Sequence, residues 1–192
     1  FQDCAVGGKY IYALYAPNDG TNGICIWDWS DPSHPVLIQQ YVYNTRTLAR
    51  CSLRGRFLYT VEFGFSGCKF RVWDVSNPYS IVPRGYYTSD TYLRYSYDFS
   101  IAGNYAFVQG YSYLVCLNIA DPDSVTYVSS ISEARGNERG WGRIVGHYLY
   151  ECHADQDRVR IFDIQNPNSI TLAGTVQDAA ILDKASDISV VG

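Results

Sequence analysis

The same two-part phrase occurs four times in this chain. Each copy opens with a Gly two residues before an aromatic residue, and these glycines lie 47, 48 and 43 residues apart. Each copy closes with a bulky apolar residue, an Asp or Asn, and a Pro four residues later. The opening pairs are Gly8/Tyr10, Gly55/Phe57, Gly103/Tyr105 and Gly146/Tyr148, and the closing groups are Trp27-Asp28…Pro32, Trp73-Asp74…Pro78, Leu117-Asn118…Pro122 and Phe162-Asp163…Pro167. A repeat of this length, holding several short strands, is typical of the blades of a β-propeller.

Each copy contains four short segments with the period of two that marks a β-strand. In the segment before the Gly, apolar residues such as Val6 and Leu53 alternate with small or polar ones such as Ala5 and Ser52. The sequence therefore predicts an all-β protein of four four-stranded antiparallel blades, approximately residues 1–48, 49–96, 97–140 and 141–185, in one propeller or propeller segment covering 1–192. The main alternative is a linear β-solenoid or array.

The last residues repeat the first ones. Residues 187–192 align with residues 3–8, so 186–192 are predicted to be the first strand of a fifth blade. In one interpretation the chain is a segment of a larger propeller of roughly six to eight blades. In the other, the surplus strand adds to the terminal edge of another copy of the chain. The chain also begins with Phe1 and has no Met, which is typical of a processed chain or a fragment.

Charge and composition exclude two classes of partner. The net charge is −4 at pH 7, which argues against binding nucleic acid through a basic field. No apolar run approaches the roughly 20 residues that span a bilayer. Six cysteines fit an oxidising compartment. Three disulfides are considered, Cys4–Cys51, Cys25–Cys68 and Cys116–Cys152, against the alternative of buried free thiols.

The closing group of each copy resembles the repeat phrase of the LVIVD family of bacterial and archaeal surface proteins. The best copies are Phe70-Arg-Val-Trp-Asp74-Val-Ser-Asn-Pro78 and Val159-Arg-Ile-Phe-Asp163-Ile-Gln-Asn-Pro167, whereas the third copy departs from the phrase at Leu117-Asn118. The resemblance covers essentially the whole chain. It implies a β-propeller on an exported or cell-surface protein and implies no reaction.

A candidate ligand site comes from residues that break the repeat. Trp141 takes a position that is otherwise charged, and Arg143 takes one that is otherwise small. If the first strands line the central channel, an aromatic ring beside guanidinium groups could hold a sugar ring or a carboxylate. The residues of this predicted site are Trp141, Arg143, Arg139, Arg135, Arg50 and Asp98. The alternative is an Arg–Asp pair within the ring, with Trp141 as packing.

Other polar residues have weaker claims. Asp155 and Asp157 in one loop, and Asp19 in the equivalent loop of the first copy, are candidate Ca²⁺ ligands, and no other cofactor is predicted. The recurring Asp28, Asp74 and Asp163 are predicted to cap turns, because a structural task recurs once per blade and an active site does not.

These patterns favour a non-enzymatic module at the cell surface or outside the cell. It would serve as a structural or interaction domain that contacts protein or glycan, within a surface assembly or filament. No Cys-x-x-Cys, phosphate loop or nucleophile motif is present. The alternative is a carbohydrate-active propeller enzyme with a carboxylate pair at the mouth of the channel.

Overall fold

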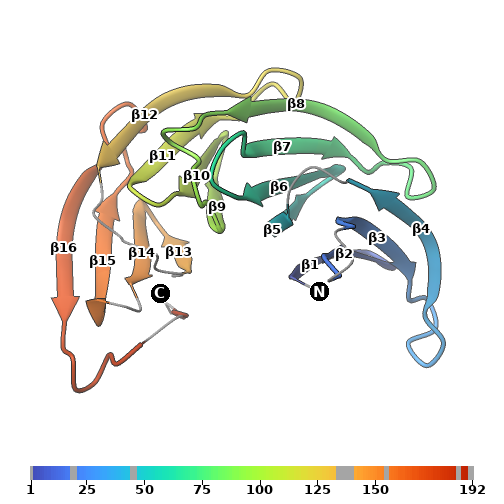
Figure 1. Ribbon diagram of the computed structural model, residues 1–192, viewed down its shortest axis with the longest axis horizontal. Helices are drawn as coiled ribbons and strands as arrows, with labels where there is room; N and C mark the ends of the chain where they lie inside the picture. Colours follow the sequence, from blue (N-terminus) through green and yellow to red (C-terminus); the bar gives the residue numbers. More distant parts are fainter. Residues whose placement is uncertain are drawn as a thin grey trace.

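The structure is a computed structural model that describes residues 2–17, 21–43, 47–132, 141–153, 156–184 and 187–189. In these residues, sixteen strands form four antiparallel sheets of four strands each, as the repeat predicts (Figure 1). The first two sheets are β1 (Asp3–Gly7), β2 (Tyr10–Tyr15), β3 (Gly23–Asp28) and β4 (Val36–Val42), then β5 (Thr47–Arg54), β6 (Phe57–Phe63), β7 (Lys69–Asp74) and β8 (Val82–Thr88). The other two are β9 (Asp98–Ala102), β10 (Tyr105–Gln109), β11 (Tyr113–Asn118) and β12 (Thr126–Ser132), then β13 (Gly142–Val145), β14 (Tyr148–His153), β15 (Arg158–Asp163) and β16 (Thr171–Gln177). Among the described residues, no helix is long and apolar enough to cross a membrane.

The four sheets stand side by side around an arc, like blades around an axis (Figure 1). The first strand of each sheet, β1, β5, β9 or β13, lies on the inside, and β4, β8, β12 and β16 lie on the outside. Each inner strand contacts the inner strand of the next sheet. This radial arrangement is that of a β-propeller and excludes the linear array.

Short turns with the same chemistry build every blade. The four glycines between the first and second strands have φ between +54° and +61°, a region that residues with a Cβ rarely enter. The Asp or Asn after the third strand accepts a hydrogen bond from the backbone N–H two residues later, as in Asp28 with Ser30 and Asp74 with Ser76. Asn118 and Asp163 do the same. The predicted role of these residues as turn caps is therefore confirmed.

Apolar side chains fill the space between neighbouring blades. Tyr12, Leu14 and Ile26 of the first blade pack against Leu58 and Trp73 of the second. Two similar clusters join the second blade to the third and the third to the fourth. Burial of such side chains contributes about 25 cal/mol per Å² of apolar surface, so these three interfaces are the main source of stability.

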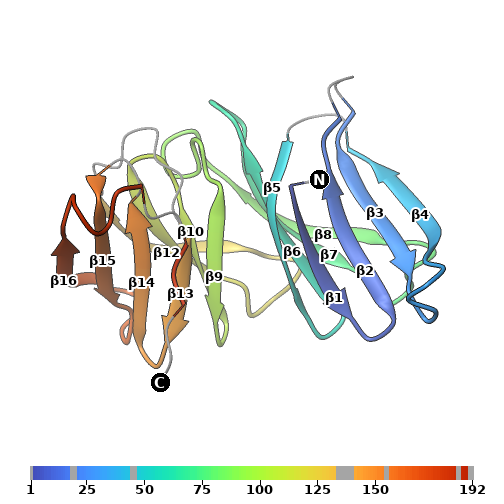
Figure 2. The ribbon, with the colours of Figure 1, turned by 90° about the horizontal axis from the view of Figure 1, so that it is seen from below.

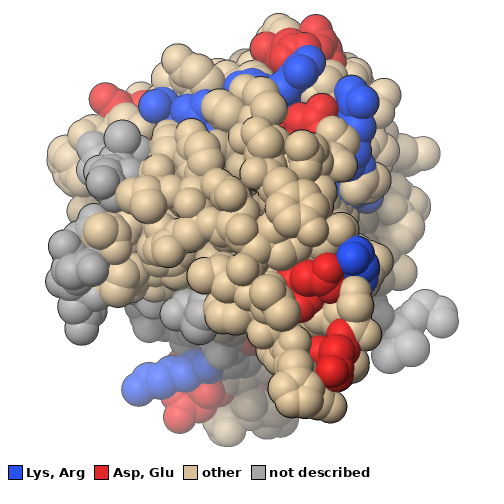
Figure 3. Space-filling view, turned by 90° about the vertical axis from the view of Figure 1, so that its right-hand side faces the viewer, with Lys and Arg blue, Asp and Glu red and all other residues tan. Residues whose placement is uncertain are grey.

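The first blade leaves the opposite face of its sheet uncovered. Ile11, Ala13, Trp27 and Pro35 line an open, mostly apolar groove of about 510 Å³ there. Figure 3 shows the neighbouring side of the molecule, where uncharged atoms dominate and charged groups gather toward the borders. Cys4 is exposed at the same face.

The predicted disulfides are not formed, because all six cysteines are free thiols. Cys4 and Cys51 occupy equivalent places on adjacent sheets, so both face the same way and the first sheet separates them. Cys116 packs toward the fourth blade. Cys152 lies three residues after Leu149, which faces the third blade, so alternation turns Cys152 to the far side of its sheet. Each disulfide would therefore have to cross a sheet.

The remaining predicted disulfide, Cys25–Cys68, is not formed for a related reason. Cys25 lies on the uncovered face of the first blade and donates to the carbonyl of Ala13. Cys68 is buried between the second and third blades. Two sheets therefore separate these thiols.

The predicted fifth blade is only partly visible. Of its proposed first strand, the structure describes residues 187–189, which are assigned to no strand. Asp187 lies beside β13, where its carboxylate is 3.5 Å from Nη2 of Arg143. The other residues of this segment lie outside the described ranges.

Candidate functional site

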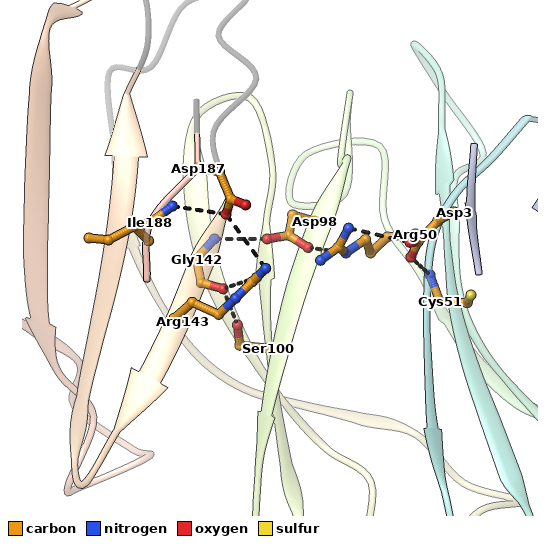
Figure 4. A network of polar contacts seen from close by, with 9 residues as sticks. All are labelled: Asp3, Arg50, Cys51, Asp98, Ser100, Gly142, Arg143, Asp187 and Ile188. Atoms are coloured by element: carbon orange, nitrogen blue, oxygen red, sulfur yellow. Dashed lines mark hydrogen bonds and ion pairs between the residues drawn. The ribbon is translucent and has the colours of Figure 1, made fainter. Parts of the chain in front are cut away.

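Charged side chains of the inner strands form a network of contacts that joins one blade to the next (Figure 4). Asp3 of β1 accepts a hydrogen bond of 2.9 Å from the backbone N–H of Cys51 on β5. Arg50, beside Cys51, reaches in both directions. Its Nη1 lies 3.4 Å from Asp3, and its Nε lies 2.9 Å from Asp98 on β9. One guanidinium thus joins three blades.

The same network of contacts continues into the fourth blade. Asp98 accepts a hydrogen bond of 2.8 Å from the backbone N–H of Gly142 on β13, which repeats the Asp3–Cys51 contact one interface later. Ser100 donates to the carbonyl of Gly142, and so does Arg143. Asp98 and Ser100 of β9 thus hold the backbone of β13, while Arg143 contacts the backbone of its own strand.

Burial sets the proton affinity of Asp98. Its side chain is fully buried, and this burial raises the pKa of its carboxyl group to about 6. Arg50 and the N–H of Gly142 act in the opposite direction because they stabilise the carboxylate. Asp98 therefore changes charge in mildly acidic solution.

A cavity of about 330 Å³ lies beside this network of charged side chains. It is at the edge of the ring where β5 and β9 begin, which is the upper edge in Figure 2. Its lining consists of Gln2, Thr47, Ala49, Arg50, Phe63, Tyr97 and Trp141. No carboxylate belongs to this lining as far as the described residues go. The volume falls at the lower end of the range for ligand pockets.

The predicted ligand residues are divided among three places. Trp141 and Arg50 line the cavity, while Asp98 lies buried behind Arg50. Arg143 lies further along the inner strand, in a separate polar hollow of about 240 Å³. Arg135 and Arg139 are outside the described residues. The structure therefore brings Arg50 to Trp141 and Asp98 to Arg50, but directs Arg143 toward Asp187.

Several aromatic residues beside the cavity were not part of the predicted site. Phe63 lines it and lies 6.0 Å from Tyr97 and 5.4 Å from Tyr95, measured between ring centroids. Tyr95 continues the contact to Phe65 and Tyr111. The sequence gives one signal for them, the density of Tyr and Arg in residues 92–97, but Phe63 ends β6 and Phe65 lies in the loop after it.

The candidate Ca²⁺ ligands do not form a site in the described residues. Asp19 and Asp155 are outside the described ranges. Asp157 is described, and its carboxylate accepts a hydrogen bond from the backbone N–H of Lys184. No group of three or more His, Cys, Asp or Glu side chains in the described part of the chain is placed to hold a metal ion.

The comparison with family models agrees with the fold. The LVIVD repeat model matches residues 1–43, 94–132 and 143–178, which together are more than half of the chain. The chain therefore belongs to the LVIVD repeat family. A comparison with curated proteins finds no match.

Solved structures share the architecture at low sequence identity. A protein from Lactobacillus plantarum matches with a TM-score of 0.76 and 12% identity, over 92% of this chain and 55% of its own. A functionally unknown protein from Desulfotomaculum acetoxidans DSM 771 matches with a TM-score of 0.69 and 12% identity, over 91% and 55%. Apo AztD from Citrobacter koseri matches with a TM-score of 0.58 and 11% identity, over 92% of this chain and 46% of its own. The chain thus spans about half the length of these proteins, and the likeness concerns the fold alone.

Proposed function

We propose that this protein is a non-enzymatic β-propeller module, at the cell surface or outside the cell, that binds a glycan or protein at the 330 Å³ cavity where β5 and β9 begin. One observation carries the proposal. The inner-strand carboxylates Asp3 and Asp98 bind Arg50 and backbone N–H groups of adjacent blades, while the neighbouring cavity is lined by aromatic and neutral polar side chains. Such a lining suits binding, because a few polar groups among aromatic rings orient a ligand.

The alternative of a carbohydrate-active enzyme requires two carboxyl groups flanking the bond to be cleaved. Asp98 has the raised pKa of a general acid. However, its oxygens contact Arg50 and Gly142, and its side chain has no exposed surface. A group enclosed in this way cannot reach a substrate, so we favour binding without turnover.

The experiment is a paired assay of binding and cleavage. The purified chain is incubated at pH 6, near the pKa of Asp98, with a panel of polysaccharides and surface-protein extracts of known composition, and new reducing ends are measured alongside retention. We expect retention of at least one glycan or protein without new reducing ends. Cleavage that the Asp98→Asn variant abolishes would establish the enzyme instead.

Self-contact is the second part of the proposal. The uncovered face of the first blade and residues 187–189 beside the fourth blade are at the two ends of the arc (Figure 1). In a surface assembly these ends would meet other copies of the chain, by strand addition at the terminal edge or by contact between sheet faces. The location outside the cell is supported by the resemblance to surface proteins and by the absence of Met.

A further inference from the structure

We infer that the cavity where β5 and β9 begin binds a linear, uncharged oligosaccharide along a strip of aromatic side chains. This inference rests on the proposed function and names its ligand. The aromatic strip consists of Trp141, Tyr97, Phe63, Tyr95, Phe65 and Tyr111. It begins inside the 330 Å³ cavity, which Trp141, Tyr97 and Phe63 line together.

The strip continues from the cavity across the second and third blades. Phe63 contacts Tyr95, and Tyr95 contacts both Phe65 and Tyr111, with ring centroids 5.4, 6.1 and 5.8 Å apart. The ring planes of these pairs are inclined by 40°, 69° and 59°, so the rings pack against one another and present edges as well as faces to the surface. The rings are half-buried, except Phe65, which is 56% exposed. Rings fixed in this way lose little conformational entropy when they contact the apolar faces of sugar rings.

Two features hold the strip in place. Tyr95 has φ +50°, a left-handed conformation that is strained for a bulky residue. Its backbone N–H donates to the carbonyl of Gly64, which ties the two loops together. The guanidinium of Arg94 lies 4.0 Å from the centroid of Phe65 and within 6 Å of those of Tyr95 and Tyr111. Backbone strain that the surroundings maintain tends to occur where a side chain must be presented to a ligand.

The charge of the site distinguishes between uncharged sugars, acidic sugars and nucleic acids, all of which can stack on aromatic side chains. Arg50, the cation of the cavity, already contacts the carboxylates of Asp3 and Asp98. The charge of Arg50 is therefore compensated in the cavity, and the guanidinium of Arg94 beside the strip is packed over the rings of Phe65, Tyr95 and Tyr111, so the galacturonate oligomers test the selection by charge directly. Single-stranded nucleic acid also stacks on aromatic side chains, but it needs a basic groove, and the net charge of this chain is −4. An uncharged saccharide satisfies both the rings and the polar rim of Gln2 and Thr47.

The test measures affinity against ligand length by titration calorimetry. The probes are β-1,4- and α-1,4-linked glucose oligomers and β-1,4-linked mannose oligomers of one to six units, with galacturonate oligomers as acidic counterparts. We expect at least one neutral series to bind more tightly as its length increases. Trp141→Ala should weaken every length, while Phe65→Ala should weaken the hexamer by about tenfold and leave the monomer unchanged, as expected for the loss of one aromatic contact.

Matched variants separate binding from folding. Trp29→Ala and Tyr79→Ala change exposed aromatic residues in turns at the opposite edge of the ring and should bind as the unmodified chain does. Tyr95→Gly relieves the strained φ but removes the ring contacts with Phe63, Phe65 and Tyr111, so its unfolding temperature is measured beside the hexamer affinity, which should fall. A purely structural Tyr95 would leave hexamer affinity unchanged.

Three results would overturn the inference. They are no binding of any neutral series, tighter binding of galacturonate oligomers than of neutral ones, or an affinity of Trp141→Ala and Phe65→Ala for the hexamer equal to that of the unmodified chain. Tight binding of the acidic oligomers alone, without cleavage, would refute the strip's ligand and leave the proposed function intact. Cleavage of any oligomer would refute the proposed function itself.

Discussion

At the scale of single residues, two glycines show that the same residue type can be required for different reasons. Gly103 has φ +54°, and a Cβ built there would meet nothing within 4 Å. Gly85 lies on β8 without a positive φ, but its Cβ would stand 2.5 Å from the backbone carbon of Asp123 in the next blade. Its N–H donates to the carbonyl of Pro122. Gly103 is therefore required by conformation, and Gly85 by close packing between blades.

Substitution with Ala should separate these two causes. Gly103→Ala should lower the free energy of unfolding by about 1 kcal/mol, the cost of a left-handed residue with a Cβ, and Gly103→Asn should recover most of it. Gly85→Ala should cost about 2–3 kcal/mol, because neighbouring backbone must move. Urea unfolding of the three variants measures these differences. Equal losses in Gly103→Ala and Gly103→Asn would contradict the conformational explanation.

Asp98 also makes the stability of the protein depend on pH. Burial raises its pKa from 3.8 to about 6 in the folded state, so between these values the folded chain binds more protons than the unfolded one. The contribution of Asp98 to stability is therefore fully present below about pH 4 and is lost as the pH rises through 6.

The Asp98→Asn variant provides the measurement. The free energy of unfolding of the unmodified chain, obtained from urea titrations at pH 4.5 and pH 7, should include this decline with rising pH. The decline should be smaller in Asp98→Asn, which has no proton to lose at this position. An identical pH dependence in both proteins would show that Asp98 has an ordinary pKa.

At the scale of strands and turns, most of the fold could be predicted from the sequence. The repeated Gly and Asp residues act through local backbone chemistry, so their roles in turns are visible in a single copy and reinforced by four. The period of two gave the strands in order. The contacts between blades were less accessible, because a strand pattern does not say which face meets which neighbour. The disulfide prediction failed for that reason.

The candidate site was predicted in part. Trp141 was singled out because it departs from the repeat, and Arg50 because it holds the charged position that Trp141 replaces in the fourth blade; both line the cavity. Phe63 and Tyr95 were not selected, because Tyr and Phe occur throughout the chain and only folding brings these two within 5.4 Å. Arg71 also makes contacts that the sequence does not reveal. It stands where the first and third blades have Cys25 and Val115, and it contacts Tyr43, which in turn donates to the buried Glu62.

At the scale of the whole molecule, the arc leaves apolar surface at its first-blade end. Within the chain, the equivalents of Ile11 and Trp27 are buried against the preceding blade, as Leu58 and Trp73 are. In the first blade this face is an open groove. Apolar patches of this kind usually mark contact sites.

The 192-residue chain is therefore expected to self-associate in solution. Light scattering coupled to size-exclusion chromatography should give a mass above 21.7 kDa that rises with concentration. Ile11→Lys should shift the mass toward that of one chain, because a charged group in the groove loses hydration on association. Val36→Lys, at an exposed position on β4, is the control and should associate as before. A monomeric unmodified chain at all concentrations would contradict this expectation.

The charged side chains of the inner strands join one blade to the next. A double-mutant cycle between Arg50 and Asp98 tests this role most directly, with urea unfolding of Arg50→Met, Asp98→Asn and the double variant at pH 7.5, where Asp98 is ionised. The free energies of unfolding should show a coupling of about 2 kcal/mol, because removing either partner leaves a partly or fully buried charge. Additive losses, within about 0.5 kcal/mol, would show that this ion pair does not hold the blades together.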